Sequence, residues 1–237
     1  MKQHILSKIL KKHILQSNQN KAIYYLKKYI KKDELEILVD LGAHQGLFTK
    51  SIANYFNLKK AFLIEPIKRN YNALLKIFEL TDYEIINTVI SNLSNQKIEF
   101  NINNYDETSS ILNIRQDIDE LSNIDSSLNK KILILSKTLD DIFSEYNIEE
   151  ISLLKIDVQG CEDLVLKGAG VALKKTKFIW VETSFKPLYE NSALFHDIYS
   201  LLTSMNFNLL EISPGYRSKT KELLQADLLF VNKEYII

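Results

Sequence analysis

The stretch Asp40-Leu-Gly-Ala-His-Gln-Gly46 decides the fold that this sequence predicts. It follows the apolar run Glu36-Ile-Leu-Val-Asp40 and leads into Leu47-Phe-Thr-Lys-Ser-Ile-Ala53, a segment expected to be helical. Glycine permits a positive φ and lets the backbone approach another group closely. We therefore expect a buried strand, a turn that contains two glycines, and a helix, in this order.

A second acid, Glu65, ends the next apolar run, Ala61-Phe-Leu-Ile-Glu65. A carboxylate about 20 residues or more beyond a glycine turn suits the recognition of ribose hydroxyls. His44 stands where a dinucleotide-binding fingerprint has its second closely spaced glycine, which disfavours a pyrophosphate ligand. The pattern indicates a nucleoside-containing cofactor without a pyrophosphate, such as S-adenosylmethionine.

Each part of that cofactor has an expected partner. Asp40 would orient the ammonium, directly or through water, and the turn from Gly42 through Ala43 to Gly46 would approach the methionyl part. Glu65 would accept hydrogen bonds from the ribose. The adenine is expected near Ser91, with Pro66 or Ile90 covering one face. Taken singly, Asp40 and Glu65 are also compatible with ordinary caps of strand ends.

Composition describes an ordinary globular chain. The 237 residues fit one α/β domain, and 46% of them are hydrophobic. Lys+Arg and Asp+Glu are equal at 30 each, and the basic residues gather near the start, so nucleic acid is not an expected partner. Cys161 is the single cysteine, which predicts no internal disulfide and a cytoplasmic location.

Strands and helices alternate from residue 36 onward. Strands are expected at 36–41, 60–65, 83–90, 97–102, 131–135, 152–157, 177–183, 207–212 and 227–232, and helices at 45–56, 67–79, 138–146, 161–167 and 193–205. This alternation predicts an α/β fold, with a mostly parallel sheet covered by helices on both faces. The last two strands are expected to form an antiparallel hairpin.

Two segments differ from this alternation. Residues 1–35 are expected to be a basic, amphipathic helical extension of a domain that spans 36–237. Packing on the domain, contact with a membrane surface and a contact between like subunits are all open for it. Residues 103–130 are rich in Asn, Asp and Ser, so they are expected to be a substrate loop or lid, or a surface excursion without function.

The sequence resembles the FkbM family of class I methyltransferases. The resemblance covers roughly residues 36–232 and is most specific between Lys155 and Ala169. It rests on Val39-Asp-Leu-Gly-Ala43 with Gly46, Ile64-Glu-Pro66, Ser109-Ser-Ile-Leu112, Thr138-Leu-Asp-Asp141, Leu154-Lys-Ile-Asp-Val-Gln-Gly160 with Glu162, Val165-Leu-Lys-Gly-Ala169 and Val181-Glu-Thr183. It implies a Rossmann-like fold, S-adenosylmethionine and a hydroxyl acceptor, often on a sugar or polyketide. Gln159 departs from the Glu of many relatives.

Methyl transfer to a hydroxyl needs a group that removes a proton. Asp157 and Glu182 end neighbouring strands, at the sheet edge where ligands of open α/β sheets bind. We expect Asp157 first and Glu182 second to act as base. The sequence has no metal-ligand spacing, so a divalent ion on these carboxylates stays unproven, and structural roles for both acids stay open.

The leading hypothesis is a S-adenosylmethionine-dependent O-methyltransferase that acts in the cytoplasm on a glycan or a small hydroxylated molecule, within glycan biosynthesis. One alternative is a nucleotide-sugar or nicotinamide enzyme, which His44 and the lack of a Tyr-x-x-x-Lys pattern disfavour. The other is a non-catalytic partner protein with the same fold. The acceptor and the oligomeric state are not determined by the sequence.

Overall fold

The computed structural model describes residues 21–115, 117 and 125–235. Its strands are β1 (Ile37–Leu41), β2 (Lys60–Ile64), β3 (Glu84–Ile86), β4 (Val89–Ile90), β5 (Lys97–Asn103), β6 (Leu128–Lys137), β7 (Ile151–Ile156), β8 (Thr176–Ser184), β9 (Phe207–Pro214) and β10 (Gln225–Asn232). Its helices are α2 (Leu47–Tyr55), α3 (Lys68–Ile77), α4 (Leu139–Glu145), α5 (Glu162–Lys167) and α6 (Phe195–Ser204). Short 3-10 helices are η1 (Asp106–Thr108), η3 (Ala172–Lys175) and η4 (Lys233–Tyr235).

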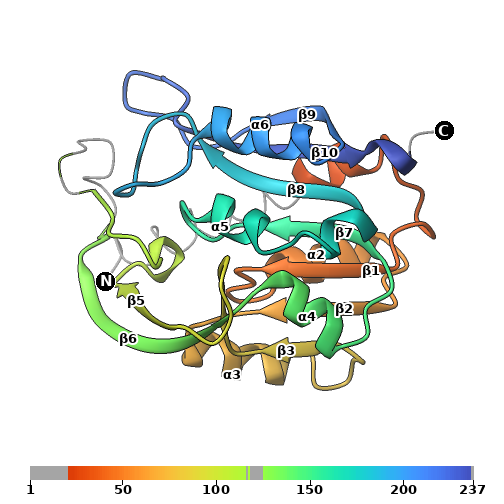
Figure 1. Ribbon diagram of the computed structural model, residues 1–237, viewed down its shortest axis with the longest axis horizontal. Coiled ribbons are helices and arrows are strands. Elements are labelled where there is room, and N and C mark those ends of the chain that lie inside the picture. The colour runs from red at the N-terminus through yellow and green to blue at the C-terminus, as the bar shows by residue number, and fades with distance from the viewer. Residues whose placement is uncertain (1–20, 116, 118–124, 236–237) are drawn as a thin grey trace, which may run out of the picture.

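A seven-stranded sheet forms the centre of the molecule, in the order β3-β2-β1-β7-β8-β10-β9 (Figure 1). Within this sheet, the neighbours among β3, β2, β1, β7 and β8 pair in parallel. β10 runs antiparallel to both β8 and β9. The expected α/β class, the mostly parallel sheet and the closing hairpin are confirmed.

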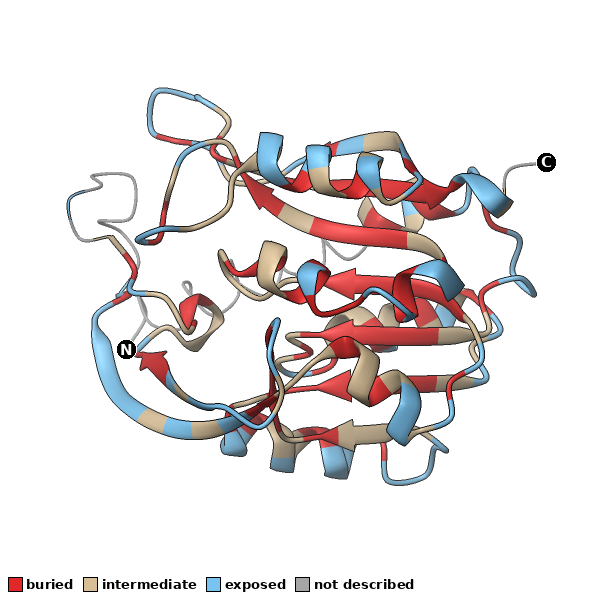
Figure 2. Ribbon diagram, in the orientation of Figure 1, coloured by how far each residue is buried: buried red, intermediate tan, exposed pale blue. Residues whose placement is uncertain are grey.

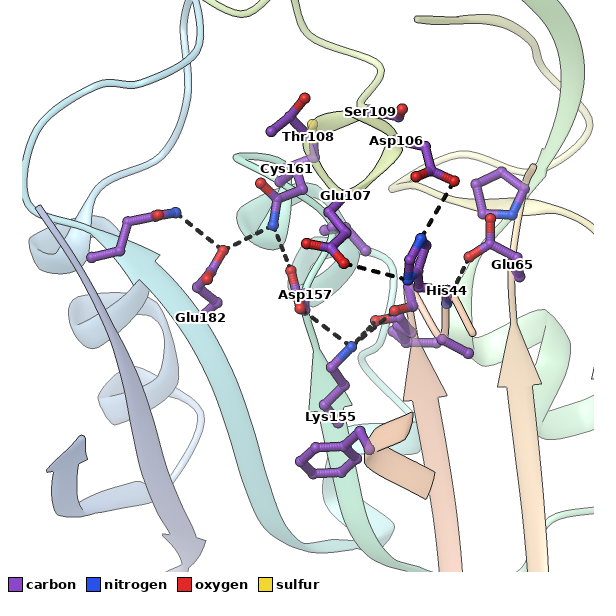
Figure 3. Close-up of a pocket in the computed structure, with 18 of the residues that line it drawn as sticks. His44, Glu65, Asp106, Glu107, Thr108, Ser109, Lys155, Asp157, Cys161 and Glu182 are labelled. Atoms are coloured by element: carbon purple, nitrogen blue, oxygen red, sulfur yellow. Dashed lines mark hydrogen bonds and ion pairs between the residues drawn. The ribbon is translucent and has the colours of Figure 1, made fainter. Parts of the chain in front are cut away.

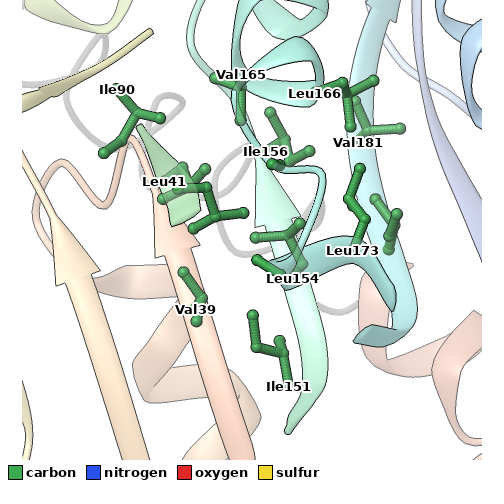
Figure 4. Packing of buried hydrophobic residues seen from close by; sticks show 14 of the residues in the cluster. Val39, Leu41, Ile90, Ile151, Leu154, Ile156, Val165, Leu166, Leu173 and Val181 are labelled. Carbon is green, nitrogen blue, oxygen red and sulfur yellow. The ribbon is translucent and has the colours of Figure 1, made fainter. Parts of the chain in front are cut away.

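Side chains of the strands alternate between two cores, one on each face of the sheet. Val39 and Leu41 pack in the core covered by α4, α5 and α6, whereas Leu38 packs in the core covered by α2 and α3. Figure 4 shows the first of these cores, and Figure 2 shows that the strands are largely buried while the helices keep exposed outer sides. Burial on both faces explains why the central strands read as continuous apolar runs.

The expected strand 83–90 is divided in the structure. β3 stays in the main sheet, whereas β4 leaves it to pair with β6 in a second sheet of order β4-β6-β5. Asn87 lies at the break and donates from its side-chain amide to the carbonyl oxygens of Glu65 (2.8 Å) and Pro66 (3.0 Å). These side-chain hydrogen bonds replace strand pairing at the break. The single apolar run 83–90 therefore supplies one strand to each of two sheets.

The N-terminal extension packs on the domain over the part that the structure describes. Residues 21–26 are helical, and Ala22, Leu26 and Ile30 are buried in the core covered by α2 and α3. Lys28 Nζ lies 2.8 Å from Glu211 Oε1 on β9. Much of the expected helical extension falls on residues 1–20, which lie outside the described residues. Among the residues described, no helix has the length and apolar character to cross a bilayer.

The two glycines of the β1–α2 turn lie so close to neighbouring protein groups that a side chain would not fit there. Gly42 has a φ of 75°, and a Cβ there would lie 2.0 Å from the carbonyl oxygen of Asp157. Gly46 has a φ of 71°, and a Cβ there would lie 2.6 Å from the ring of Phe78. We expected these glycines to let the backbone approach a ligand. The structure adds that they let the turn approach β7 and α3.

Replacing Gly42 by alanine should therefore destabilise the protein by about 3 kcal/mol, from a left-handed φ and an overlap with backbone. Gly170→Ala is the matched control, because the nearest atom to a Cβ there is 3.8 Å away and the φ is not positive. That control should stay within about 0.5 kcal/mol of the unaltered protein. Urea unfolding measures both, and equal losses would refute the tight contact at Gly42.

Candidate functional site

A cavity of about 650 Å³ lies at the carboxyl ends of β1, β2, β7 and β8 (Figure 3). Its wall comes from segments far apart in the sequence, chiefly 42–45, 64–67, 88–90, 105–109 and 157–159, with Lys155, Glu182, Tyr189, Gln225 and Asp227. This is the edge at which ligands of open α/β sheets bind. The cavity brings together most of the residues that the sequence singled out, and it is the candidate active site.

Glu65 lies at one end of the cavity, directly after β2. Its side chain is almost fully buried, and its two oxygens accept hydrogen bonds from the backbone N–H groups of His44 and Ile67, each at 2.8 Å. Burial raises the pKa of Glu65, and the two N–H groups act against that rise. Each carboxylate oxygen keeps further acceptor capacity, so Glu65 can still bind hydroxyl groups. Ala43 and Pro66 line the cavity beside it.

Asp40 lies behind the cavity wall, with no exposed surface. Its Oδ2 accepts from Thr49 Oγ1 at 2.7 Å, and its Oδ1 lies 3.2 Å from Lys155 Nζ. The same ammonium lies 2.9 Å from the carbonyl oxygen of Gly42 and 3.4 Å from Asp157 Oδ2. Burial acts to lower the pKa of Lys155, but the two carboxylates outweigh it and the pKa is raised. Lys155 already contacts this carboxylate, and Asp40 does not line the cavity. The expected contact of Asp40 with a ligand ammonium stays a prediction.

Two further residues expected at the cofactor lie outside the cavity wall. Gly46 begins α2 and faces α3, and Ser91 is buried, with its hydroxyl donating to Asn92 Oδ1 at 3.2 Å. Neither lines the cavity, whereas Thr88, Val89 and Ile90 do. The apolar surface of Val89 and Ile90 therefore stands where adenine was expected, and the role of Ser91 stays a prediction.

His44 joins the cofactor turn to the segment that carries η1. Its Nε2 lies 3.3 Å from Asp106 Oδ2, and its Nδ1 lies 3.9 Å from Glu107 Oε1. Asp106 also accepts from Arg69 at 2.5 Å and from Asn70 at 3.1 Å. Burial acts to lower the pKa of His44, but Asp106 outweighs it and the net shift is upward. Part of the expected lid, residues 103–115, thus covers the cofactor end, while 116 and 118–124 lie outside the described residues.

Asp157 and Glu182 lie at the other end of the cavity and share one hydrogen-bond donor. Gln159 Nε2 donates to Asp157 Oδ1 at 2.7 Å and to Glu182 Oε2 at 3.0 Å. Burial, and then the nearby carboxylates of Asp157 and Asp227, raise the pKa of Glu182 well above its usual range. Asp227 stands opposite Glu182 in the β8–β10 pair, and burial raises its pKa to about 7. The structure therefore brings the two expected acids together and adds a third.

Three other residues have structural explanations or lie elsewhere. Glu162 caps the turn before α5, accepting from the N–H groups of Val158 and Gly160. Cys161 is buried against Ser110, and burial raises the pKa of its thiol, which disfavours the reactive thiolate. His196 pairs with Asp197 on the surface and does not line the cavity.

Sequence reasoning did not find Asp106, Gln225 or Asp227 as parts of the site. Asp227 lies in a strand that looked structural, and only the register of β10 against β8 places it beside Glu182. For Lys155 the sequence did contain a signal. Residues two apart in a strand share a face, so the spacing of Lys155 and Asp157 predicts that they lie on the same side of the sheet.

The comparisons with known proteins agree with this geometry. A model of the methyltransferase FkbM domain matches residues 40–209. The 2-O-methyltransferase NoeI of Sinorhizobium fredii is 29% identical over 173 residues, which cover 71% of each chain.

Two solved structures share the fold. A methyltransferase FkbM from Methylobacillus flagellatus has a TM-score of 0.54 and 16% identity over 86% of this chain, which spans 46% of that protein. A S-adenosylmethionine-dependent methyltransferase from Clostridium acetobutylicum has a TM-score of 0.51 and 10% identity, with 96% of both chains covered. The Rossmann-like methyltransferase fold expected from the sequence is confirmed.

The contact of His44 with Asp106 should make the stability of the folded protein depend on pH. In Asp106→Asn the pKa of His44 should fall, because the closest negative charge is removed. When the pKa of a histidine is raised in the folded protein, its protonation stabilises the fold at pH values below the unfolded-state pKa of about 6.5. This stabilisation is lost as the pH rises through the folded-state pKa. The stability lost in Asp106→Asn should therefore be larger near about pH 6 than near about pH 9.

Imidazole NMR titration and urea unfolding at both pH values measure these effects. Glu107→Gln is the control, since its carboxylate is farther from His44 and should change the titration less. A His44 midpoint that does not move in Asp106→Asn would contradict the contact.

Proposed function

Because this chain belongs to the FkbM family of methyltransferases, we propose that it transfers a methyl group from S-adenosylmethionine to a hydroxyl group of a sugar or glycan. That it is a S-adenosylmethionine-dependent methyltransferase follows from the family, and the acceptor is the proposed part. The name of the 29% identical relative, a 2-O-methyltransferase, supports oxygen as the methylated atom. The observation that carries the proposal is one cavity with Glu65 at one end and Asp157 and Glu182 at the other.

The residues at the Glu65 end fit the cofactor. Glu65 is held by two backbone N–H groups and still has lone pairs for the ribose hydroxyls. Val89 and Ile90 give an apolar wall for the adenine, and the backbone at Gly42 and Ala43 lines the cavity next to them. This set has no cradle for a pyrophosphate, which agrees with a nucleoside ligand that lacks one.

The cofactor supplies a methyl group that is already activated by its bond to a positively charged sulfur. The protein must therefore orient the acceptor oxygen and remove its proton. Asp157 faces the cavity, with Oδ1 fixed by Gln159 and Oδ2 next to Lys155. We assign to Asp157 the acceptance of the hydroxyl proton, and to Glu182 the binding of the acceptor next to it.

The family match argues against the two alternatives, a nucleotide-sugar or nicotinamide enzyme and a non-catalytic partner protein. Among the residues that the structure describes, no group of three or more His, Cys, Asp or Glu side chains is arranged to hold a metal ion. A divalent ion on the carboxylates of the cavity remains a proposal from the sequence. A role in glycan biosynthesis, a cytoplasmic location, contact of residues 1–35 with a membrane and assembly of like subunits remain proposals from the sequence.

Glu65→Ala should weaken the binding of S-adenosylhomocysteine at least tenfold, because hydrogen bonds to a charged group contribute about 1.5–3 kcal/mol each. Glu84→Ala, at a half-buried acid of β3 that pairs with Lys60 and does not line the cavity, should leave the affinity unchanged. Calorimetry measures both, and thermal unfolding shows whether each variant is folded. An affinity within about threefold of the unaltered protein would refute the ribose assignment.

Asp157→Asn should keep the affinity for S-adenosylhomocysteine within about threefold and lower methyl transfer by at least about 100-fold, the contribution typical of a general base. Release of S-adenosylhomocysteine in the presence of a panel of sugars and oligosaccharides measures the transfer. Asp163→Asn, at a half-buried acid that pairs with Lys167 and does not line the cavity, is the control and should remain fully active. Transfer by the unaltered protein to amines but to no sugar would contradict the proposed acceptor class.

A further inference from the structure

Gln159 occupies the centre of the acidic end of the cavity. Its backbone has a φ of 57°, and its carbonyl oxygen accepts from Ser110 Oγ at 2.8 Å. Its side-chain amide accepts from the hydroxyl of Tyr189 at 2.8 Å and donates to both Asp157 and Glu182. Every polar atom of this side chain is therefore used by a protein partner.

The orientation of the Gln159 amide is determined by these partners. If the amide were reversed, its carbonyl oxygen would stand 2.7 Å from Asp157 Oδ1 and 3.0 Å from Glu182 Oε2. The contact with Asp157 would then not be a hydrogen bond while Asp157 is ionised. Tyr189 is buried, and its single hydroxyl hydrogen is shared between the Gln159 amide oxygen and the carbonyl oxygen of Thr108 at 3.0 Å, so this hydroxyl is held in place.

Asp157 and Glu182 differ in their other partners. Asp157 has the ammonium of Lys155 at 3.4 Å. Glu182 has no cation within ion-pair distance among the described residues; it accepts from Gln225 Nε2 at 3.1 Å and faces Asp227 across the strand pair. The high pKa of Glu182, caused by burial and by these acids, agrees with a proton held on this side chain. A pair of acids with such different environments can divide the roles of proton acceptor and hydrogen-bonding acid.

We propose that Gln159 is a positioning residue, whose amide holds Asp157 and Glu182 side by side so that Asp157 receives the proton of the acceptor hydroxyl. The inference rests on the proposed function, in which Asp157 is the base. The amide nitrogen stands between the two carboxylates, and its two hydrogens supply one bond to each. It thereby fixes their separation.

Other charged groups also face this pair and set the background of its titration. They are Lys155 on β7, Asp227 on β10, Glu162 on α5, and Lys21, with Tyr189 as a further titratable group. None of them is altered in the variants below, so a change in titration reports the loss of the amide.

The test follows the carboxyl carbons of Asp157 and Glu182 by 13C NMR in the full chain, with the Asp157 signal assigned from Asp157→Asn. Gln159→Met removes the donor to both acids, so both carbons should titrate at higher pH, by about one unit for each lost hydrogen bond. Gln225→Met is the matched control. It removes a donor to Glu182 alone, so only the Glu182 carbon should move.

Methyl transfer provides the second readout. Gln159→Met should lower kcat at least tenfold, while KM and the affinity for S-adenosylhomocysteine stay within about threefold. The acidic limb of the pH profile should move to higher pH together with the Asp157 carbon. If Gln159→Met does not fold, Gln159→Glu replaces the donors by a third carboxylate of the same length and should move both carbons further in the same direction.

An Asp157 carbon that does not move in Gln159→Met or Gln159→Glu would overturn the inference, and so would an unchanged kcat. The NMR titration needs no acceptor, so it distinguishes this failure from a failure of the proposed function. The latter would appear as a lack of methyl transfer to sugars by the unaltered protein, whatever the titration shows.

Discussion

The buried ammonium of Lys155 holds the site together. It lies between Asp40 at the end of β1, Asp157 after β7 and the carbonyl oxygen of Gly42 in the cofactor turn. A buried ion pair contributes little net stability, but removing one partner leaves an uncompensated charge inside the protein. Loss of Lys155 would leave two acids next to each other at the junction of both ends of the cavity. The position of the cofactor turn relative to the candidate base therefore depends on this side chain together with the pairing of β1 and β7.

The fold connects the two ends of the cavity through short polar contacts. Glu65 holds the backbone of His44, and the His44 ring contacts Asp106 in the segment that covers the cofactor end. The same segment reaches the acidic end, where Ser110 and Thr108 contact Gln159 and Tyr189. One stretch of chain thus contacts both the expected cofactor side and the expected acceptor side.

The sequence predicted what depends on local pattern. Apolar runs located nine strand regions, and Asp157 and Glu182 were found because both end strands at the ligand-binding edge. What it missed depends on register and on contacts distant in sequence. Asp227 is next to Glu182 only through antiparallel pairing, and the break at Asn87 follows from bonds to the chain after β2. The contact of Asp40 with Lys155 was likewise not evident, because nothing local in the sequence reveals it.

The charge of the acidic end is moderated by several groups. Lys155 pairs with Asp157, and amides from Gln159 and Gln225 contact Glu182. Burial favours protonated forms of Glu182 and Asp227. A fully ionised acid cluster would bind a sulfonium strongly before reaction, and that attraction would fade as the positive charge leaves the sulfur during transfer. Binding that is stronger in the ground state than in the transition state slows a reaction. An acid group with reduced charge can accept a proton through Asp157 without this penalty, which explains why the site combines carboxylates with amides and a lysine.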